Sequence, residues 1–515
     1  MHRQIKRSTD RKILCLEDLI QKVEELKAKG KTVVQTHGVF DIIHPGMIQH
    51  ITSAKSLGNV LIVTVIKDKD VRRGPGRPVF SEKLRAENVS NLEPVDYVCA
   101  VDDGVPFECI KQIKPDIFAK GQSYSERDKK IHDRIFKEER ELYLGKVKIF
   151  ETSGFSFSSS KIINNFLDIY PEDTKQYLRK FSLKYSFESI AENINSLKNL
   201  KVLIIGDGII DEYHYCSPMG KAAKAQLVVN KFLTYERFAG GAFAIANHIA
   251  GICDNVTLVT LLGANDSHEA FITRNLKPGI QTKYFIRDDG PTVVKKRYVD
   301  WYNNQKLFEV NYLNDLYITG DCESEIIKYL SSAIPEYDLV AACDFGHGFI
   351  SRGVIGVMDK LSNILAVNTQ TNAANTGFNL ITKYRRSDFV CLDEPEARLA
   401  IQNKFDGARE VADELIHRLG SEKLIITLGK KGAYGIDKSG NTHHAPIFSS
   451  KVIDTVGAGD AFFAYTAPCF AMKMPLDFIT FIGNVVGAIA VQIIGNKRAV
   501  EKYEILEFIH SLLKN

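Results

Sequence analysis

One short stretch near the end of the chain carries the residues best suited to chemistry. Residues 454–460 read Asp-Thr-Val-Gly-Ala-Gly-Asp, and an apolar run at helical spacing follows. Glycines just before a helix leave backbone N–H groups free at the positive end of the helix dipole, where phosphate typically binds. The carboxylate of Asp460 would stand beside this anion and could take a proton from an attacking hydroxyl. The stretch therefore predicts phosphoryl transfer, with an ordinary glycine-rich helix start as the alternative.

The composition is that of an ordinary globular protein and predicts two or three domains for 515 residues. Lys and Arg total 67 against 63 Asp and Glu, so we expect no nucleic acid and no membrane as a main partner. Nine scattered cysteines without a C-x-x-C pair indicate reduced thiols in a cytoplasmic protein. The basic residues 1–12 lack an apolar stretch, and we expect no secretory signal. The apolar run 478–495 predicts a buried helix rather than a membrane span.

The first part of the chain predicts a parallel sheet. Residues 14–29 have helical apolar spacing, and a strand at 32–36 runs into the glycine-containing turn at 37–47. A helix at 48–57 and a second strand at 60–65 complete a βαβ unit with a right-handed crossover. Residues 123–144, which alternate in charge, predict an exposed helix.

The second part predicts a doubly wound parallel α/β sheet, because short apolar strands alternate with helical stretches from Lys201 onward. Two pieces rich in β-branched residues, Gln226 to Thr234 and Thr292 to Asp300, predict a small separate sheet. We place the first domain at 1–165, a helical linker at 166–199, and the second domain at 200–515.

The turn at 37–47 resembles the G-x-F-D-x-x-H-x-G-H signature of nucleotidyltransferases that transfer CMP or AMP to a small phosphate ester. Gly38, Phe40, Asp41, His44 and Gly46 fit it. The resemblance implies a Rossmann-like domain in which these residues bind the nucleotide and His44 acts in catalysis.

Further positions extend that resemblance and one departs from it. Glu82 and Arg85 follow the second strand, Lys120 ends a later strand, and Ser159 and Ser160 fill the slot of the family's S-T-T segment. The resemblance implies that Lys120, Ser159 and Ser160 bind the nucleotide, with CTP or ATP as the nucleotidyl donor. Met47 occupies the place of the second histidine, so we expect slow transfer or none.

Residues 454–464 resemble the C-terminal signature of the PfkB/ribokinase family of sugar kinases. The resemblance implies ATP as the phosphoryl donor and Asp460 as the base that takes the proton from the substrate hydroxyl. It implies that the amides of Gly457, Ala458 and Gly459 hold the transferring phosphoryl group. It also implies a ribokinase-like fold whose small β lid covers the sugar and forms a dimer contact.

The same resemblance implies a sugar site. Asp211 matches the aspartate that bonds sugar hydroxyls, and Gly240 and Gly241 match the pair where the backbone approaches the sugar, which only glycine permits. The asparagine that usually follows is absent, and the nearest one is Asn247, about a turn further along.

Several residues are candidates for contacts with an anionic substrate. These are Lys295, Lys296 and Arg297 on the expected lid, and His347, for which a satisfied loop histidine is the alternative. Asn368 begins an amide-rich segment where heptose-phosphate kinases carry an Asp-Pro-Lys type segment. The difference indicates another substrate, or none.

The resemblance also implies a metal and a nucleotide site. Asp393 and Glu396 occupy the slot of the family's N-x-x-E motif, which organises Mg²⁺, a cation that prefers such oxygen ligands. Thr427, Gly429 and Gly432 match the turn that lines the adenine nucleotide.

A sugar kinase joined to a nucleotidyltransferase resembles, in reversed order, the bifunctional enzymes that make nucleotide-activated heptose for lipopolysaccharide. The resemblance implies phosphorylation of a sugar or sugar phosphate, then nucleotidyl transfer to a sugar phosphate, in a homodimer or larger homo-oligomer. One alternative is a kinase whose first domain only binds nucleotide or serves as a scaffold. Others are a protein that keeps both folds as binding modules, and a kinase for a nucleoside or free hexose.

Overall fold

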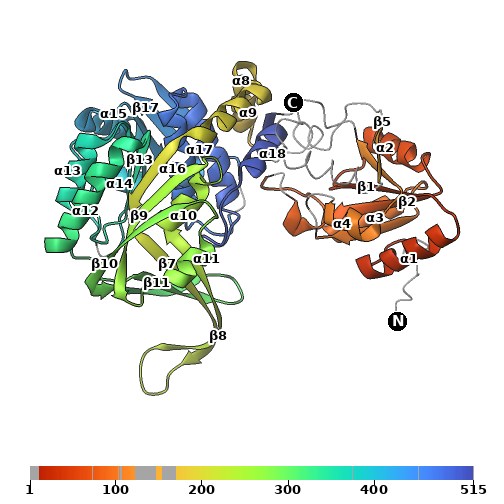
Figure 1. The fold of residues 1–515 in the computed structure, drawn as a ribbon, viewed down its shortest axis with the longest axis horizontal. Coiled ribbons are helices and arrows are strands. Elements are labelled where there is room, and N and C mark those ends of the chain that lie inside the picture. Colours follow the sequence, from red (N-terminus) through yellow and green to blue (C-terminus); the bar gives the residue numbers. More distant parts are fainter. Residues whose placement is uncertain are drawn as a thin grey trace. The chain divides into compact units, whose positions relative to one another are not determined.

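The computed structural model describes residues 11–71, 74–102, 104, 107–121, 147–152, 170–373, 375–449 and 452–513. The chain forms two compact units: residues 1–191 with 506–515, and residues 192–505. Helices α8 (Glu172–Lys184) and α9 (Phe187–Ser196) occupy much of the segment expected as a helical linker (Figure 1). The charged segment 123–144 and the serines Ser159 and Ser160 lie outside the described residues.

The first unit contains a five-stranded parallel sheet in the order β3-β2-β1-β4-β5. Its strands are β1 (Val33–Gly38), β2 (Val60–Ile66), β3 (Tyr97–Val101), β4 (Ile117–Gly121) and β5 (Lys148–Thr152). Its helices include α1 (Leu16–Ala28), α2 (Pro45–Lys55), α3 (Glu82–Ser90) and α4 (Phe107–Ile113). The predicted strand–helix–strand unit is confirmed, with β1 and β2 parallel.

Helices cover both faces of this sheet. Val33 packs in one buried cluster with Leu19 of α1 and Phe107 of α4. Its neighbour Val34 packs in another with Ile51 of α2 and with α3. Successive side chains of a strand point to opposite faces, so a strand covered on both sides carries apolar residues at successive positions, as Val33 and Val34 show.

The second unit is built on a nine-stranded sheet in the order β10-β9-β6-β13-β14-β15-β16-β17-β18. Its strands are β6 (Lys201–Gly206), β9 (Asn255–Asn265), β10 (Gln281–Pro291), β13 (Leu339–Asp344), β14 (Leu365–Thr369), β15 (Phe389–Asp393), β16 (Lys423–Thr427), β17 (Ala433–Asp437) and β18 (Thr442–Ala445). All neighbours are parallel except at β16–β17 and β17–β18. The expected α/β class and doubly wound sheet are confirmed.

Two helical layers enclose that sheet (Figure 1). The helices are α10 (Ala242–Ile249), α11 (Glu269–Asn275), α12 (Gly320–Ala333), α13 (Arg352–Leu361), α14 (Glu394–Ile401), α15 (Ala408–Leu419), α16 (Ala458–Ala471) and α17 (Leu476–Ala490). The last helix, α18 (Lys502–Leu513), has most of its residues in the first unit. Leu203 and Ile205 of β6 pack in a large apolar cluster with residues of α12, α13, α14 and α15. Helices α10 and α16 cover the opposite face, and α16 carries Asp460 there.

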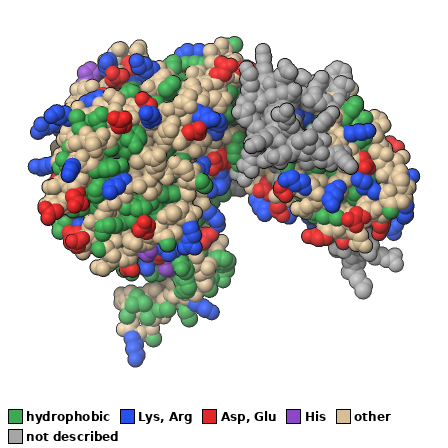
Figure 2. Space-filling view, viewed as in Figure 1, with side chains coloured by type: hydrophobic (Ala, Val, Ile, Leu, Met, Phe, Trp, Pro, Cys, Tyr) green, Lys and Arg blue, Asp and Glu red, His purple; other side chains and the backbone are tan. Residues whose placement is uncertain are grey.

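A separate four-stranded sheet, here called the lid sheet, has the order β12-β11-β7-β8. It consists of β7 (Gly208–Lys221), β8 (Val228–Gly241), β11 (Val293–Asp300) and β12 (Lys306–Tyr312). Both pieces predicted from their β-branched residues contribute to it. Figure 2 shows apolar side chains gathered on its projecting part, and the exposed ones include Leu227, Val228, Phe232, Tyr235, Phe308 and Val310.

The apolar run 478–495 forms most of α17, whose residues are nearly all buried. Among the helices that the structure describes, none has both the length and the apolar character needed to cross a bilayer.

Candidate active site

The glycine loop lies at the start of α16, as expected. Gly457 has a φ of 81°, and a Cβ there would lie 2.1 Å from Asn496 Oδ1, so the loop requires glycine. The amide of Ala458 donates to the carbonyl of Thr455. Within the described part of the chain the amides of Gly457 and Gly459 have no acceptor. They are the donors that an anion at this helix start would use.

Asp460 lies in the first turn of α16 and is only 6% exposed. Burial, together with the charge of Asp211, raises its pKa to about 7. Gln370 donates to Asp460 Oδ1 at 2.5 Å, and this bond and the charge of Lys295 oppose the rise. A carboxyl group with a pKa near 7 is suited to act as a general base at neutral pH.

Asp211 lies beside this loop and is held by residues far apart in the sequence. Its Oδ1 is paired with Arg297 on β11, and its Oδ2 accepts a bond of 3.4 Å from Asn496 Nδ2. A Cβ at Gly240 would lie 2.1 Å from Asp211 Oδ2, so a side chain there would displace the carboxylate. The structure thus brings together three residues that were expected to bind the sugar, Asp211, Gly240 and Arg297, and it places them near Gly457.

Gly241 has a different local role. Its φ is 57°, and a Cβ would lie 2.6 Å from the carbonyl oxygen of Asp207. It ends β8 and caps α10, so its glycine is required by backbone geometry.

The three basic residues of β11 divide between the two faces of the lid sheet. Lys295 and Arg297 face Asp211. Burial lowers the pKa of Lys295 although the charge of Asp211 opposes this effect, whereas the charges of Asp211 and Glu309 outweigh burial and raise the pKa of Arg297. Lys296 points to the other face, where its Nζ lies 3.6 Å from Glu212 and over the ring of Tyr312. Lys296 is therefore not part of the proposed site.

Asn247 does not reach the sugar residues. Its Nδ2 donates to the carbonyl of Asn275 at 2.8 Å, and its Oδ1 accepts from the amide of Lys277 at 2.8 Å. Both ends of the amide thus hold the end of α11 and the residues that follow it. We do not propose Asn247 further as a substrate contact.

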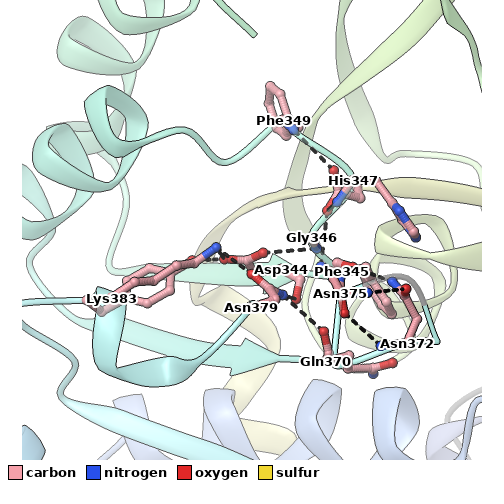
Figure 3. A network of polar contacts seen from close by, with 12 residues as sticks. Asp344, Phe345, Gly346, His347, Phe349, Gln370, Asn372, Asn375, Asn379 and Lys383 are labelled. Carbon is pink, nitrogen blue, oxygen red and sulfur yellow. Dashed lines mark hydrogen bonds and ion pairs between the residues drawn. The ribbon is translucent and has the colours of Figure 1, made fainter. Parts of the chain in front are cut away.

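A network of amide side chains holds Gln370, and in it Asn379 donates to the carbonyl of Gln370 at 3.0 Å (Figure 3). Asn368 donates to the carbonyl of Cys391 at 2.8 Å and accepts from Gln370 at 3.3 Å. Asn368 thus orients Gln370, which bonds Asp460. Sequence reasoning missed Gln370, although the amide-rich segment beginning at Asn368 was a signal for it.

Asp454 connects the glycine loop to the lid sheet. It accepts bonds from Tyr213 Oη at 2.8 Å, Lys306 Nζ at 2.7 Å and the amide of Gly495 at 2.9 Å. A cavity of about 230 Å³ lies beside these residues. Sequence reasoning missed Asp454 as a contact between these two elements, because Tyr213 and Lys306 are remote in the chain.

Asp393 and Glu396, the expected metal ligands, form a capping box at the start of α14. Asp393 Oδ1 accepts from the amide of Glu396 at 2.8 Å, and Glu396 accepts from the amides of Asp393 and Thr371 at 3.0 and 2.9 Å. Burial and the charge of Asp393 raise the pKa of Glu396. Asp393 is exposed at the end of β15, where its carboxylate can make one contact to a hydrated Mg²⁺.

The expected adenine turn joins β16 to β17. Thr427 ends β16, and Gly429 and Gly432 have φ values of 56° and 90°. A Cβ at Gly432 would lie 2.0 Å from the carbonyl oxygen of Ala445. The turn therefore needs glycine, and its contact with nucleotide stays a prediction.

The candidate turn of the first unit is bonded mainly to its own chain. Asp41 is buried and accepts from the amides of Val79 and Phe80 at 2.9 and 3.0 Å. Phe40 has a φ of 51°, and its ring lies 3.3 Å from where a Cβ of Gly38 would be. These residues shape the turn.

Helix α2 begins immediately after this turn. His44 is its N-cap and accepts from the amide of Met47 through Nδ1 at 3.3 Å, while Pro45 and Gly46 form its first positions. Met47 packs in the apolar cluster with Phe40 and Ile51. Burial lowers the pKa of His44, so it acts as a neutral ring whose Nε2 carries the proton.

Two further basic groups lie near the end of β4. The ring nitrogens of His50 lie 2.7 Å from Thr36 Oγ1 and 2.6 Å from Thr152 Oγ1, so His50 is held by both threonines. Lys120 is buried at the end of β4.

Arg85 of α3 has a structural role. It is fully buried and donates to the carbonyls of Val39 and Ile66.

Comparison with known proteins gives two family matches. Residues 199–502, more than half of the chain, match the family described as pfkB family carbohydrate kinase. Residues 36–165 match the family described as cytidylyltransferase-like.

Similar curated proteins carry the name bifunctional protein HldE. The protein from Syntrophotalea carbinolica is 34% identical over 165 residues, which is 32% of each chain. That from Trichlorobacter lovleyi is 25% identical over 58% of this chain and 60% of its own length. That from Sulfurimonas denitrificans is 43% identical over 121 residues, 25% of its length. The matches thus span between a quarter and three fifths of these relatives.

Similar solved structures include a ribokinase from Thermotoga maritima, with 20% identity and a TM-score of 0.48, covering 61% of this chain and all of that one. A ribokinase from Arabidopsis thaliana, complexed with ribose and ATP, is 16% identical with a TM-score of 0.47, covering 60% of this chain and 99% of that one.

Proposed function

Because the chain belongs to the pfkB family of carbohydrate kinases, we propose that its second unit transfers the γ-phosphoryl group of ATP to a sugar hydroxyl with Asp460 as the base. One observation carries this proposal. Asp460 lies buried beside free amides of a helix start and has a pKa of about 7, which suits proton transfer at neutral pH.

The transfer assigns a role to each group around the loop. The acceptor oxygen forms a bond to the γ-phosphorus, the bond from that phosphorus to the β,γ-bridging oxygen breaks, and Asp460 takes the hydroxyl proton. The amides of Gly457 and Gly459 offset the negative charge on the transferring group, and the amide of Ala458 joins them by giving up its 3.3 Å bond to the Thr455 carbonyl. Asp211 orients the sugar hydroxyls, and Arg297 holds Asp211 in place.

We propose that Asp393 and Glu396 hold Mg²⁺, which when bound neutralises charge on the nucleotide phosphates. Their capping box fixes the two carboxyl groups at the start of α14. Thr427, Gly429 and Gly432 would line the adenine nucleotide at the end of β16.

We propose further that the acceptor is a heptose-like sugar or sugar phosphate, and that the first unit transfers a nucleotidyl group from CTP or ATP to a sugar phosphate. The similarity of both parts of the chain to proteins named bifunctional protein HldE supports this pairing. The product would be a nucleotide sugar for lipopolysaccharide or capsule synthesis. All nine cysteines are free thiols, in accord with a cytoplasmic enzyme.

The second candidate function is a kinase whose first unit only binds nucleotide. Met47 favours it, because its side chain is in an apolar cluster where the signature has a histidine. His44 retains a proton on Nε2 and can still donate to one phosphate oxygen.

The experiment that tests the kinase is direct. The purified chain, given ATP, Mg²⁺ and a panel of heptoses, heptose phosphates and other sugar phosphates, is expected to consume ATP with at least one acceptor. If none of these acceptors leads to consumption of ATP, the proposed function is wrong. Nucleotide binding without any turnover would favour a protein that only binds.

We also propose that the lid sheet pairs with a second copy of the chain, since its exposed face carries Phe232 and Phe308, each 52% exposed. Sedimentation is expected to show a dimer or a larger oligomer. The substitution Phe308→Asp is expected to weaken the association between the copies. Phe405→Asp, at a residue 91% exposed outside the lid sheet, is the control and should leave it intact. A monomeric wild type at micromolar concentration would contradict the proposal.

A further inference from the structure

The carboxylate of Asp454 lies where the chain enters the glycine loop and is buried, with 8% of the residue exposed. Its Oδ1 accepts hydrogen bonds from Lys306 Nζ at 2.7 Å and from the amide of Val456 at 3.1 Å. Its Oδ2 accepts from Tyr213 Oη at 2.8 Å and from the amide of Gly495 at 2.9 Å. Each oxygen thus joins one side chain of the lid sheet to one backbone amide.

The two amides belong to segments that lie on either side of Gly457. Val456 precedes Gly457 in the chain, and Gly495 precedes Asn496, whose Oδ1 would lie 2.1 Å from a Cβ at Gly457. Asn496 also donates, at 3.4 Å, to the carboxylate that we propose orients the sugar hydroxyls. The position of Asp454 therefore sets the spacing between the Gly457 amide and that carboxylate.

Lys306 is the one cation among the four donors to Asp454. Burial raises the pKa of this carboxyl group, but the bond from Lys306 and the three neutral donors outweigh burial and keep the pKa below its usual value. Among the described residues, the ion pair with Lys306 is the only one that Asp454 makes. A buried carboxylate that loses its cation is costly. Without Lys306, Asp454 would move toward solvent or take a proton, and either change weakens its bonds to the two amides.

Lys306 begins β12, which is the edge strand of the lid sheet. Its side chain is 36% exposed, whereas that of Asp454 is 7% exposed, so Lys306 does not fill the core. A second ion pair of the same strand, from Glu309 to Arg297 at 2.7 Å, leads on to Asp211. The edge strand thus bonds to both the glycine loop and the sugar-binding carboxylate.

We propose that Lys306 is a positioning residue for phosphoryl transfer, which acts through Asp454 to hold the backbone on both sides of Gly457. The inference rests on the proposed kinase function and extends the machinery of the glycine loop to the edge of the lid sheet. In this role Lys306 orders the loop that holds the transferring group, so its loss lowers kcat. A direct contact between Lys306 and the acceptor would instead be seen in the KM for the acceptor.

The first test is kinetic. Lys306→Ala is expected to lower kcat for phosphoryl transfer about 10- to 100-fold, with little change in the KM for the acceptor. Lys306→Arg keeps the charge and should retain most of the activity. Lys296→Ala, on the opposite face of the lid sheet, is the control and should match the wild type. A wild-type kcat in Lys306→Ala, or a loss confined to the acceptor KM, would overturn the proposal.

The second test asks whether Lys306 acts through Asp454, and it uses a double-mutant cycle. In Asp454→Asn the charge that Lys306 neutralises is gone, because the asparagine side chain is neutral. Adding Lys306→Ala to Asp454→Asn is therefore expected to change kcat by less than about twofold. The same loss in both backgrounds would show that Lys306 acts elsewhere, which contradicts the proposal.

The third test needs no turnover and measures hydrogen exchange in the whole chain without ligand. The peptide that covers residues 452–460 is expected to exchange faster in Lys306→Ala than in the wild type or Lys296→Ala, because the Val456 amide loses its acceptor. Peptides from β13 should be unchanged, which excludes global unfolding as the cause. Equal exchange of the loop in all three proteins would overturn the proposal. If the wild type phosphorylates no acceptor, the kinase proposal fails, and this exchange still decides whether Lys306 holds the loop.

Discussion

The two glycine turns of this chain differ in what their polar groups already bind. In the second unit the amides of Gly457 and Gly459 have no acceptor among the described residues, and His347 has no bond at either nitrogen. In the first unit Asp41 accepts from two amides, and His44 caps its own helix. Groups left unsatisfied are available to a ligand, whereas groups bonded to the chain shape it.

The difference is sharpest at two matched positions. Asp460 is placed in the first turn of α16 with its pKa raised to about 7. Met47 is placed in the first turn of α2, and its side chain packs against Phe40 and Ile51. The first turn of α16 therefore carries a carboxyl group that can take a proton, whereas the matched position of α2 carries a side chain that belongs to the apolar core. We therefore expect an active kinase and a slow nucleotidyltransferase.

The largest effect is expected at the kinase base. Asp460→Asn should lower kcat for phosphoryl transfer by about 10²–10⁴, because the amide is isosteric but cannot take the proton. The measurement is ATP consumption with an acceptor sugar. ATP affinity and Tm serve as controls and should change little, since the anion site is backbone. A variant that keeps more than about a tenth of the wild-type kcat would show that Asp460 is not the base.

The next effect is expected at the other helix start. Met47→His should raise the release of pyrophosphate from CTP or ATP, with a sugar phosphate acceptor, by about 10²–10³. The imidazole supplies a donor for the phosphates that the thioether cannot supply. Met47→Leu is the matched control and should leave the rate unchanged. A wild type that already transfers at ordinary rates, with no gain from histidine, would contradict the role given to Met47.

A smaller effect is expected at Gln370. Its hydrogen bond lowers the pKa of Asp460, so Gln370→Leu should raise that pKa. The base must be ionised to act, and the acidic limb of the pH–rate profile should therefore move to higher pH. At pH 7 the rate should fall roughly 3- to 10-fold and should recover by about pH 9. Gln370→Glu should move the limb further, because it adds a like charge. An unmoved limb would show that Gln370 does not tune the base.

The smallest effect is expected at Asn247. Asn247→Ala should change kcat and the acceptor KM by less than about twofold, while it lowers the free energy of unfolding by about 1 kcal/mol. The amide bonds Asn275 and Lys277, and among the described residues it makes no hydrogen bond to a residue of the proposed site. A tenfold rise in the acceptor KM would show that Asn247 contacts the acceptor sugar.

The sequence was informative where a local pattern determines the structure. The apolar strands, the glycine turns and the position of Asp460 in a first helical turn all follow from residues that are adjacent in the chain. The sheet formed by the two β-branched pieces also follows from such local preference. These features depend on periodicity and on glycine backbone geometry, which a single sequence displays.

The remaining site residues depend on contacts that no local pattern displays. Gln370 reaches Asp460 across 90 residues, and Asn496 reaches Asp211 across 285. Strand alternation predicts that Lys295 and Lys296 face opposite ways, but only the packed sheet determines which of them faces the base. Asn247 was misplaced for the same reason, since the orientation of α10 is set by tertiary packing.

The central claim is that this chain transfers phosphoryl groups readily and nucleotidyl groups slowly. The most direct measurement incubates the whole chain and Mg²⁺ with its sugar phosphate acceptor and with ATP labelled at either the γ- or the α-phosphorus, and repeats the α-label with CTP. Label from the γ-position is expected to reach the acceptor at least about 100-fold faster than label from the α-position of either nucleotide. Equal rates, or incorporation of the α-label alone, would contradict the account.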